Sequence, residues 1–257
     1  MIPDTHAHLD MIEGPPEEAV ERALDAGVSP IVTIGIDLES SRRAVEMAET
    51  IPGVFASVGI HPNDASQWTP ASMDEIARLA HKDKVVAVGE SGLDYYRDSA
   101  PVAMQAESFR AHIRLANAVG KALIVHDREA HADTLDILKV EGAGDSPVVL
   151  HCFSGDESVL ARCVAAGYYL SFAGPVTFKN AEATRELAAL VPEDRLLAET
   201  DAPFLSPDPF RGKPNLPERV TLVAKAIAGA RGISFEEMET LLADNTARVF
   251  GVPVEGV

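Results

Sequence analysis

The stretch ALIVHDREAHADTLDILKVEGAGDSPVVLH, residues 122–151, decides the fold. Its two short apolar runs, Ala122–His126 and Val148–His151, are typical of buried strands. A helical pattern, Ala130–Glu141, lies between them, and strand, helix and strand in succession form the repeating unit of a parallel sheet. Both strands end in a histidine, so the unit also places an imidazole at two neighbouring strand ends.

The same alternation of strands and helices continues in both directions along the chain. Further strands are expected at Ile2–His8, Pro30–Ile34, Val54–Ile60, Val85–Gly89, Tyr168–Phe172 and Leu196–Thr200. Further helices are expected at Glu17–Ala26, Ser40–Thr50, Pro70–Ala80, Met104–Val119, Glu157–Ala166, Ala181–Leu190, Pro217–Ala230 and Ser234–Phe250. This α/β pattern predicts one (β/α)8 TIM barrel over residues 1–257. An open doubly wound sheet is the alternative, but no GxGxxG follows any strand, which weakens its nucleotide-binding version.

The composition, with 46% hydrophobic and 24% charged residues, is that of a globular protein. No run approaches the ~18 apolar residues that cross a bilayer, and no basic region followed by an apolar stretch indicates a secretory signal. The two cysteines, Cys152 and Cys163, are expected to be free thiols. We therefore expect a cytoplasmic protein, monomeric and without an obligate protein partner.

The chain is strongly acidic, with 22 Lys+Arg against 40 Asp+Glu and a formal charge of −18. Such a surface repels nucleic acid, whose backbone is normally bound by lysine and arginine. A polyanionic substrate would therefore have to be held locally, by metal ions or by a few basic residues.

Side chains that bind metals follow the strands. The six candidates are His6, His8, Glu90, His126, His151 and Asp201. The carboxyl ends of parallel barrel strands meet at one rim, where six polar groups without partners would be costly to bury. His61 also ends a strand, whereas His81, His112 and His131 lie in helical or linking stretches and are expected at the surface or in packing.

The number of candidates predicts more than one metal ion. A catalytic zinc usually takes three protein ligands and a water, and a structural zinc normally shows closely spaced cysteine pairs. Four imidazoles and two carboxylates instead suit two divalent ions bridged by a carboxylate. Imidazole-rich sites favour Zn, Mn, Co or Fe while Mg prefers oxygen ligands, so the choice among Mg, Mn, Zn and Co stays open.

The motifs DTHAHLD, GIHP, VGESGLDYY, HCFSG, ETDAPFL, RGKPN and NTARVFG, in this order, resemble the TatD family of metal-dependent hydrolases in the amidohydrolase superfamily. The resemblance implies a barrel with a binuclear metal site and deoxyribonuclease activity, often 3′–5′ exonuclease. It implies that His6, His8 and Asp201 bind one metal, that His126 and His151 bind the second, and that Glu90 bridges them. Many small-molecule amidohydrolases use a carboxylated lysine on strand four, which VVAVGES lacks. Ser91, where an aliphatic residue is expected, and Leu216, where an acid is common, depart from the family pattern.

Asp201 and Glu90 are the predicted catalytic residues, with Asp201 orienting a metal-activated water and taking up its proton. His61, Arg211 and Lys213 are candidate phosphate contacts, of which His61 rests on the resemblance. Tyr95 and Tyr96 are expected either to stack on a base or to pack under their loop.

Asp4 and Glu199 each precede a proposed ligand by two residues on a strand, so they face the same way. We expect them to support the ligands by accepting hydrogen bonds from imidazole N–H groups, or else to form a salt bridge inside the barrel.

The sequence thus predicts a metal-dependent deoxyribonuclease that cleaves phosphodiester bonds at DNA ends or in short oligonucleotides, as a 3′–5′ exonuclease on single-stranded ends. A binuclear hydrolase of a small amide, ester or lactone is the alternative. An inactive metal-binding protein is disfavoured by the intact set of six ligands.

Overall fold

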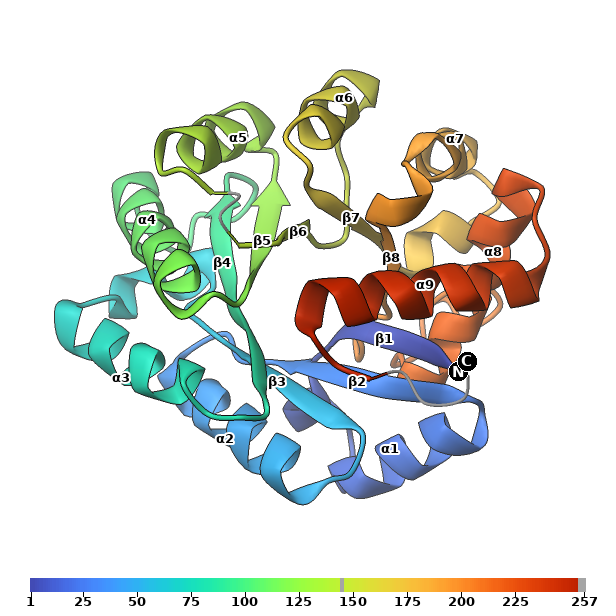
Figure 1. Cartoon of the computed structure of the whole chain (residues 1–257), viewed down its shortest axis with the longest axis horizontal. Coiled ribbons are helices and arrows are strands. Elements are labelled where there is room, and N and C mark those ends of the chain that lie inside the picture. Colours follow the sequence, from blue (N-terminus) through green and yellow to red (C-terminus); the bar gives the residue numbers. More distant parts are fainter. Residues whose placement is uncertain (144–145, 254–257) are drawn as a thin grey trace.

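Eight parallel strands follow one another in chain order around the inner ring of the molecule (Figure 1). The computed structural model describes residues 1–143 and 146–253. The strands are β1 (Ile2–Ala7), β2 (Val28–Ile34), β3 (Val54–Val58), β4 (Val85–Asp94), β5 (Ala122–Arg128), β6 (Val148–Leu150), β7 (Tyr169–Phe172) and β8 (Leu196–Ala198). Hydrogen bonds from Asp201 N–H to the His6 carbonyl (2.9 Å) and from His8 N–H to the Ala202 carbonyl (2.7 Å) join the segment after β8 to β1. The predicted (β/α)8 barrel is confirmed.

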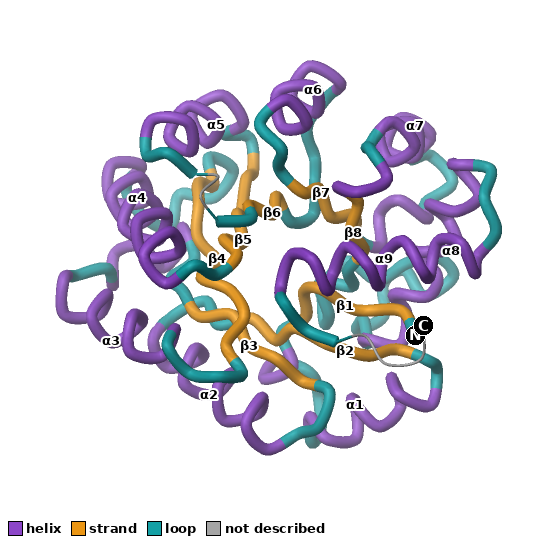
Figure 2. Tube along the Cα trace, viewed as in Figure 1, coloured by secondary structure: helices purple, strands orange, loops and turns teal. Residues whose placement is uncertain are grey.

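Most of the helices form an outer layer around this ring (Figure 2). They are α1 (Pro16–Asp25), α2 (Leu38–Thr50), α3 (Pro70–Ala80), α4 (Val102–Val119), α5 (His131–Val140), α6 (Glu157–Ala165), α7 (Glu182–Leu190), α8 (Val220–Arg231) and α9 (Phe235–Phe250). Side-chain caps begin several of them, as at Thr69 before α3, whose hydroxyl accepts the N–H of Ser72 (3.0 Å). Pro217 forms a short 3-10 turn before α8 rather than the start of the predicted helix.

The last helix, α9, covers the barrel end where the strands begin (Figure 1). The amide of Asn245 donates to the carbonyls of Glu193 (2.7 Å) and Leu196 (2.8 Å), at the entrance to β8. The terminal amine of Met1 pairs with Glu239 (2.9 Å). The opposite barrel end, where the strands finish, is left to the βα loops.

Alternate residues of the strands belong to two different hydrophobic clusters. The smaller cluster joins the C-terminal end of α9, with Val249 and Phe250, to alternate strand residues that include Val32, Ile124, Val149 and Leu197. The larger cluster takes intervening residues, among them Ile31, Leu123 and Val148, with apolar faces of the helices. This period of two assigns the smaller cluster to the barrel interior and the larger one to the layer between strands and helices.

Strand β4 is longer than predicted, since it continues past Gly89 to Asp94. Gly89 and Gly92 have φ values of +130° and +151°, which favour glycine, and the pairing with β5 changes register between Val88 and Ser91. A Cβ added at Gly92 would collide with the carbonyl oxygen of His126. Gly89 and Gly92 therefore allow β4 to stay paired with β5 as far as Asp94, at the carboxyl end of the barrel.

The substitution Gly92→Ala is expected to destabilise the chain by about 3 kcal/mol, because it combines a disfavoured φ with a backbone collision. Gly229→Ala is the matched control: Gly229 lies inside α8 with no atom within 4 Å of an added Cβ, so alanine should stabilise the chain by about 0.5–1 kcal/mol. Urea unfolding of both variants measures the difference. Equal midpoints for Gly92→Ala and the unsubstituted chain would contradict the role given to this glycine.

Both cysteines, Cys152 and Cys163, are free thiols, as expected. Within residues 1–143 and 146–253, no helix combines the length and the apolar character that a membrane crossing requires.

Candidate metal centre

The period of two along the strands aims the predicted ligands into the barrel. His126, His151 and Glu199 each follow by two residues a member of the interior cluster: Ile124, Val149 and Leu197, respectively. Their side chains therefore face the barrel interior, just beyond its last apolar layer. The imidazoles of β1 come from the same end, where His6 is fully buried.

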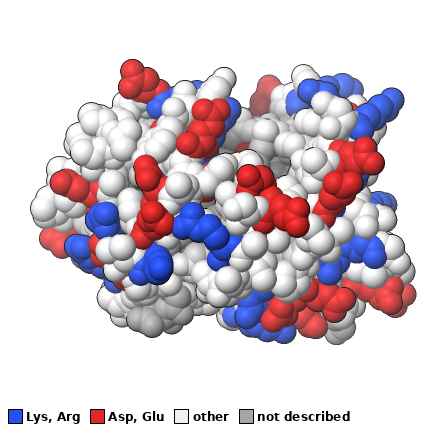
Figure 3. Space-filling model, turned by 90° about the horizontal axis from the view of Figure 1, so that it is seen from above, with Lys and Arg blue, Asp and Glu red and all other residues white. Residues whose placement is uncertain are grey.

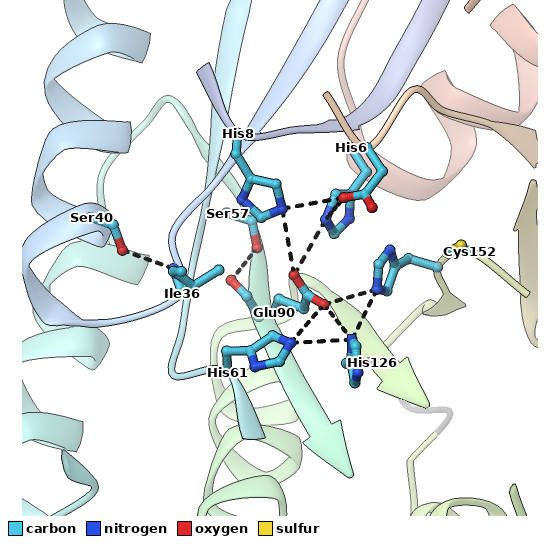
Figure 4. A network of polar contacts seen from close by, with 12 residues as sticks. His6, His8, Ile36, Ser40, Ser57, His61, Glu90, His126 and Cys152 are labelled. Carbon is cyan, nitrogen blue, oxygen red and sulfur yellow. Dashed lines mark hydrogen bonds and ion pairs between the residues drawn. The ribbon is translucent and has the colours of Figure 1, made fainter. Parts of the chain in front are cut away.

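Glu90 lies at the centre of the histidines and divides them between its two oxygens (Figure 4). Oε1 lies 2.8 Å from His126 Nδ1, 2.8 Å from His151 Nε2 and 3.5 Å from His61 Nε2. Oε2 lies 3.3 Å from His6 Nε2 and 4.0 Å from His8 Nε2. One carboxylate thus joins two groups of imidazoles.

Asp201 faces the group around Oε2. Its Oδ1 lies 3.3 Å from His8 Nε2 and 3.7 Å from His6 Nε2. The residue has φ of +56°, a left-handed conformation that aspartate and asparagine tolerate better than most residues. Its side chain is 13% exposed against 3% for Glu90, so Asp201 lies nearer to the open side of the site. All six predicted ligands are therefore brought together at one end of the barrel.

Charges in this cluster shift the pKa values of its members. Burial alone would raise the pKa of Glu90, but His151, His61 and His126 hold it well below its usual value. Burial alone would lower the pKa of His151, but Glu90 and Glu199 outweigh this and raise it well above the usual value. Asp201 also keeps a lowered pKa, because His8 and His6 outweigh its burial. The carboxylates are therefore ionised at neutral pH and available to a cation.

Several buried atoms in the cluster find no hydrogen-bond partner among the described residues. They include Nδ1 of His6 and Nδ1 of His8. The rings of His6 and His151 stack at 4.1 Å between centroids, an arrangement that two imidazolium cations would oppose. Ligand atoms within 4.8 Å of one another occur in three groups: His6, His8 and Glu90; His61, Glu90 and His126; and His6, His151 and Glu199. Imidazole and carboxylate donors with unmet polar atoms suit a divalent metal.

The two predicted supporting acids have different partners. Glu199 Oε1 lies 3.3 Å from His151 Nδ1 and accepts the N–H of Cys152 (2.7 Å), so it does face a ligand imidazole. Asp4 instead accepts the backbone N–H (2.8 Å) and hydroxyl (2.6 Å) of Thr200. The expected imidazole partner of Asp4 is therefore wrong, because the nearby His6 ring points toward Glu90. Burial raises the pKa of Asp4 to about 8.

Asp94 is a further acid at the site that the sequence reasoning missed. Its Oδ2 lies 3.2 Å from His126 Nε2, while its Oδ1 accepts the N–H groups of Tyr96 and Arg97 at 2.9 Å each. Asp94 thus links a candidate ligand to the loop after β4. It lies four residues after Glu90 and on the same strand face, a signal that is readable only if β4 continues past Gly89.

A cavity of about 820 Å³ opens above the cluster, and its lining includes His61 but neither Arg211 nor Lys213. The guanidinium of Arg211 lies 4.4 Å over the ring of Phe178, and the carbonyl of Lys213 accepts the hydroxyl of Ser206 (2.5 Å). The structure therefore brings one of the three predicted phosphate contacts to the site. The basic residues in the cavity lining are instead Arg97 and Arg128, of which Arg128 follows the candidate ligand His126 by two residues.

Two histidines set aside in the sequence have clear partners. His112 is buried in α4, where its Nε2 accepts the N–H of Ile60 (3.0 Å), in agreement with a packing role. His131 lines the cavity and lies 2.8 Å from Asp127, so it is nearer to the site than expected.

Comparison with known proteins relates this site to a family. The profile of the family described as TatD related DNase matches residues 3–251. The uncharacterized metal-dependent hydrolase YabD of Bacillus subtilis is 44% identical over 98% of this chain and 100% of its own length. The 3′-5′ ssDNA/RNA exonuclease TatD of Klebsiella pneumoniae is 34% identical over 94% of each chain. The crystal structure of YJJV, a TatD homologue of Escherichia coli, superposes with a TM-score of 0.93 at 31% identity over 98% of each chain.

Proposed function

This chain belongs to the TatD-related DNase family of metal-dependent hydrolases, and on that premise we propose that it removes nucleotides from the 3′ end of single-stranded nucleic acid with two divalent metal ions. The observation that carries the proposal is the position of Glu90, whose two oxygens each face a separate group of imidazoles. The name of the Klebsiella relative supports the choice of substrate and direction.

The proposed ligands fall into two sets. His6, His8 and Asp201 would hold one ion, His126 and His151 would hold the other, and Glu90 would bridge them. When bound, the two ions would neutralise charge on the phosphoryl oxygens and activate the attacking water.

The protein side chains would position the substrate and transfer protons. Asp201 combines a lowered pKa with partial exposure, so it would orient the attacking water and accept its proton. Nδ1 of His61 accepts the N–H of Asn63 (3.0 Å), which leaves Nε2 to carry a proton on the side facing Glu90. Because His61 lines the cavity, its Nε2–H would turn from the side of Glu90 and His126 to a phosphate oxygen when a substrate is bound, rather than bind a metal.

The charge distribution fits a local rather than a broad contact with nucleic acid. On the face shown in Figure 3, acidic and basic side chains form small interspersed groups. The net charge of −18 still opposes extended binding to a duplex. A single-stranded end that enters the cavity would meet Arg97, Arg128 and the metal ions while most of the nucleic acid stays outside.

The test is an assay on single-stranded DNA and RNA oligonucleotides labelled at the 3′ end, with Mg, Mn, Zn or Co or with EDTA. We expect release of a labelled mononucleotide in at least one metal and none in EDTA. A duplex with blunt ends is the control and should be trimmed more slowly.

The acidic surface favours a second candidate, a hydrolase of small amides, esters or lactones that uses the same centre. If the chain with two bound metals leaves DNA and RNA intact but cleaves such a compound, the nuclease proposal is overturned.

A further inference from the structure

Three exposed apolar side chains lie on one side of the cavity. They are Phe204 (50% exposed), Leu205 (38%) and Met11 (38%), and all three line it. Phe204 comes three residues after Asp201, and its ring meets His8 edge to face at 5.8 Å between centroids. A large aromatic side chain thus remains half exposed beside the candidate metal ligands, where a ligand with an apolar face could cover it.

The loop after β8 holds Phe204 and Leu205 outward. The N–H of Phe204 donates to the carbonyl of Asp201 (2.8 Å), and Leu205 has φ of +50°. The loop after β7 lies so close that a Cβ on Gly174 would collide with the carbonyl of Leu205. The position of Phe204 is therefore set by the backbone around it.

The other side of the cavity carries the two arginines. Arg128 ends β5, and its guanidinium carbon lies 4.0 Å from the centre of the Tyr96 ring. Arg97 is held by the N–H bond to Asp94, and Tyr95 N–H donates to the Arg128 carbonyl (2.9 Å). Among the described residues, no carboxylate lies within ion-pair distance of Arg97 or Arg128. In so acidic a chain, two such arginines beside a cavity indicate an anionic ligand.

The order of the strands sets these two sides apart. In a ring that runs from β1 to β8, the strands β4 and β5 lie across from β8 and β1 (Figure 2). Arg97 follows β4 and Arg128 ends β5, whereas Met11 follows β1 and Phe204 follows β8. Glu90 lies among the imidazoles between these two sides. A nucleic acid end offers matching chemistry, with phosphates along the strand and a flat apolar face on its last base.

We propose that Phe204 stacks on the unpaired 3′-terminal base of the substrate, and that Arg128 binds the phosphate preceding the scissile one. This inference rests on the proposed function and adds a reason for its strand preference. A base that is paired and stacked in a duplex cannot lie on Phe204 without first being separated from its partner.

Kinetics of the full chain with bound metal test the base contact. The substrates are two single-stranded oligonucleotides labelled at the 5′ end, one with a 3′-terminal thymidine and one with a tetrahydrofuran abasic residue in its place. We expect the abasic end to lower kcat/KM by ~10–100-fold, mainly through KM, since stacking of one base has this magnitude. Phe204→Ala should show the same loss of kcat/KM on the thymidine end and no further loss on the abasic end. Phe204→Trp should keep the difference in kcat/KM between the two ends, because tryptophan can still stack on a base.

Two matched variants serve as controls. Leu190→Ala removes an exposed apolar side chain (57%) at the end of α7, outside the cavity lining, and should change neither substrate. Arg195→Ala removes an arginine just before β8, whose guanidinium carbon lies 5.0 Å from the centre of the Tyr169 ring and outside the cavity lining. It should likewise change neither substrate. Arg128→Ala should instead raise KM about 10-fold. A methylphosphonate in place of the phosphate that precedes the scissile one should raise KM of the unsubstituted chain by the same factor. Combining the variant with the modified substrate should give no further increase.

The outcomes separate the two proposals. If the chain trims neither oligonucleotide with any metal, the proposed nuclease function fails. If the unsubstituted chain trims the thymidine and abasic ends with equal kcat/KM, the nuclease stands and the stacking contact is wrong. The same holds if Phe204→Ala and Phe204→Trp each lower kcat/KM equally on the two substrates. If Arg128→Ala weakens the methylphosphonate substrate as much as the ordinary one, Arg128 does not bind that phosphate.

Discussion

Glu90→Gln is expected to lower the hydrolytic activity of the chain by about 10³-fold, because a loss of about 4 kcal/mol of transition-state stabilisation corresponds to this factor. Glutamine keeps the shape of the side chain but replaces one oxygen by an NH₂ group, which cannot bind a metal. Either the group around His126 and His151 or the group around His6 and His8 would then lose its shared carboxylate oxygen. Metal analysis should accordingly find fewer bound ions per chain, alongside the lower kcat/KM.

Glu141→Gln is the matched control for this prediction. Glu141 pairs with Arg110 and Arg114 at 2.8 Å each, outside the cavity lining, and surface pairs of this kind contribute little to stability. Its variant should keep both metal content and kcat/KM. A Glu90→Gln chain with full metal content and unchanged activity would show that Glu90 does not bridge the two groups.

The barrel could be predicted because its strands are buried on both faces and read as short apolar runs between helical patterns. The residues at which the strands end were harder to predict. Gly89 and Gly92 are ordinary loop signals, yet in this chain their positive φ values keep β4 paired with β5 up to Asp94. Local residue preferences give no information on that pairing, since it depends on a strand that follows some thirty residues later.

The six candidate ligands could be predicted for a geometric reason, because strand ends of a parallel barrel converge wherever the strands lie in the sequence. Asp94 and Arg128 were missed because each requires the correct end of a strand before its face can be assigned. The exposure of Phe204 depends on the folded loop and has no signal in ETDAPFL.

The motif RGKPN led to a different error. Its basic residues suggested phosphate binding, but the folded loop places their side chains away from the cavity. Asn215 anchors this loop through its N–H to the carbonyl of Pro203 (2.9 Å) and its amide to the carbonyl of Thr200 (2.9 Å). Arg211 and Lys213 stay outside the cavity lining. Leu216, where an acid is common in the family, packs against the hydrophobic core, which accounts for its apolar character.

Asp201→Asn is expected to lower kcat by about 10³-fold at pH 7, within the range that a positioned general base contributes. Asparagine suits this position because it tolerates the φ of +56° as aspartate does, so the fold should be retained. The unsubstituted chain keeps Asp201 ionised at neutral pH, since His8 and His6 hold its pKa below the usual value despite burial. The amide of asparagine cannot accept the proton of the attacking water at this pH.

Loss of a proton acceptor differs from loss of a metal ligand in its pH dependence. If Asp201 is the base, hydroxide from solution replaces it in the variant, so kcat of Asp201→Asn should rise about tenfold per pH unit between pH 6 and 8 while the unsubstituted chain changes less. Asp136→Asn, which alters only an exposed pair with Arg162 (2.7 Å), should follow the unsubstituted chain throughout. A variant with the usual metal content, a low kcat and the unsubstituted pH profile would assign Asp201 to substrate positioning, whereas an unchanged kcat would remove it from the mechanism. When metal analysis shows equal metal content at each pH, the steep profile identifies the base, because misplaced substrate does not make the rate follow hydroxide.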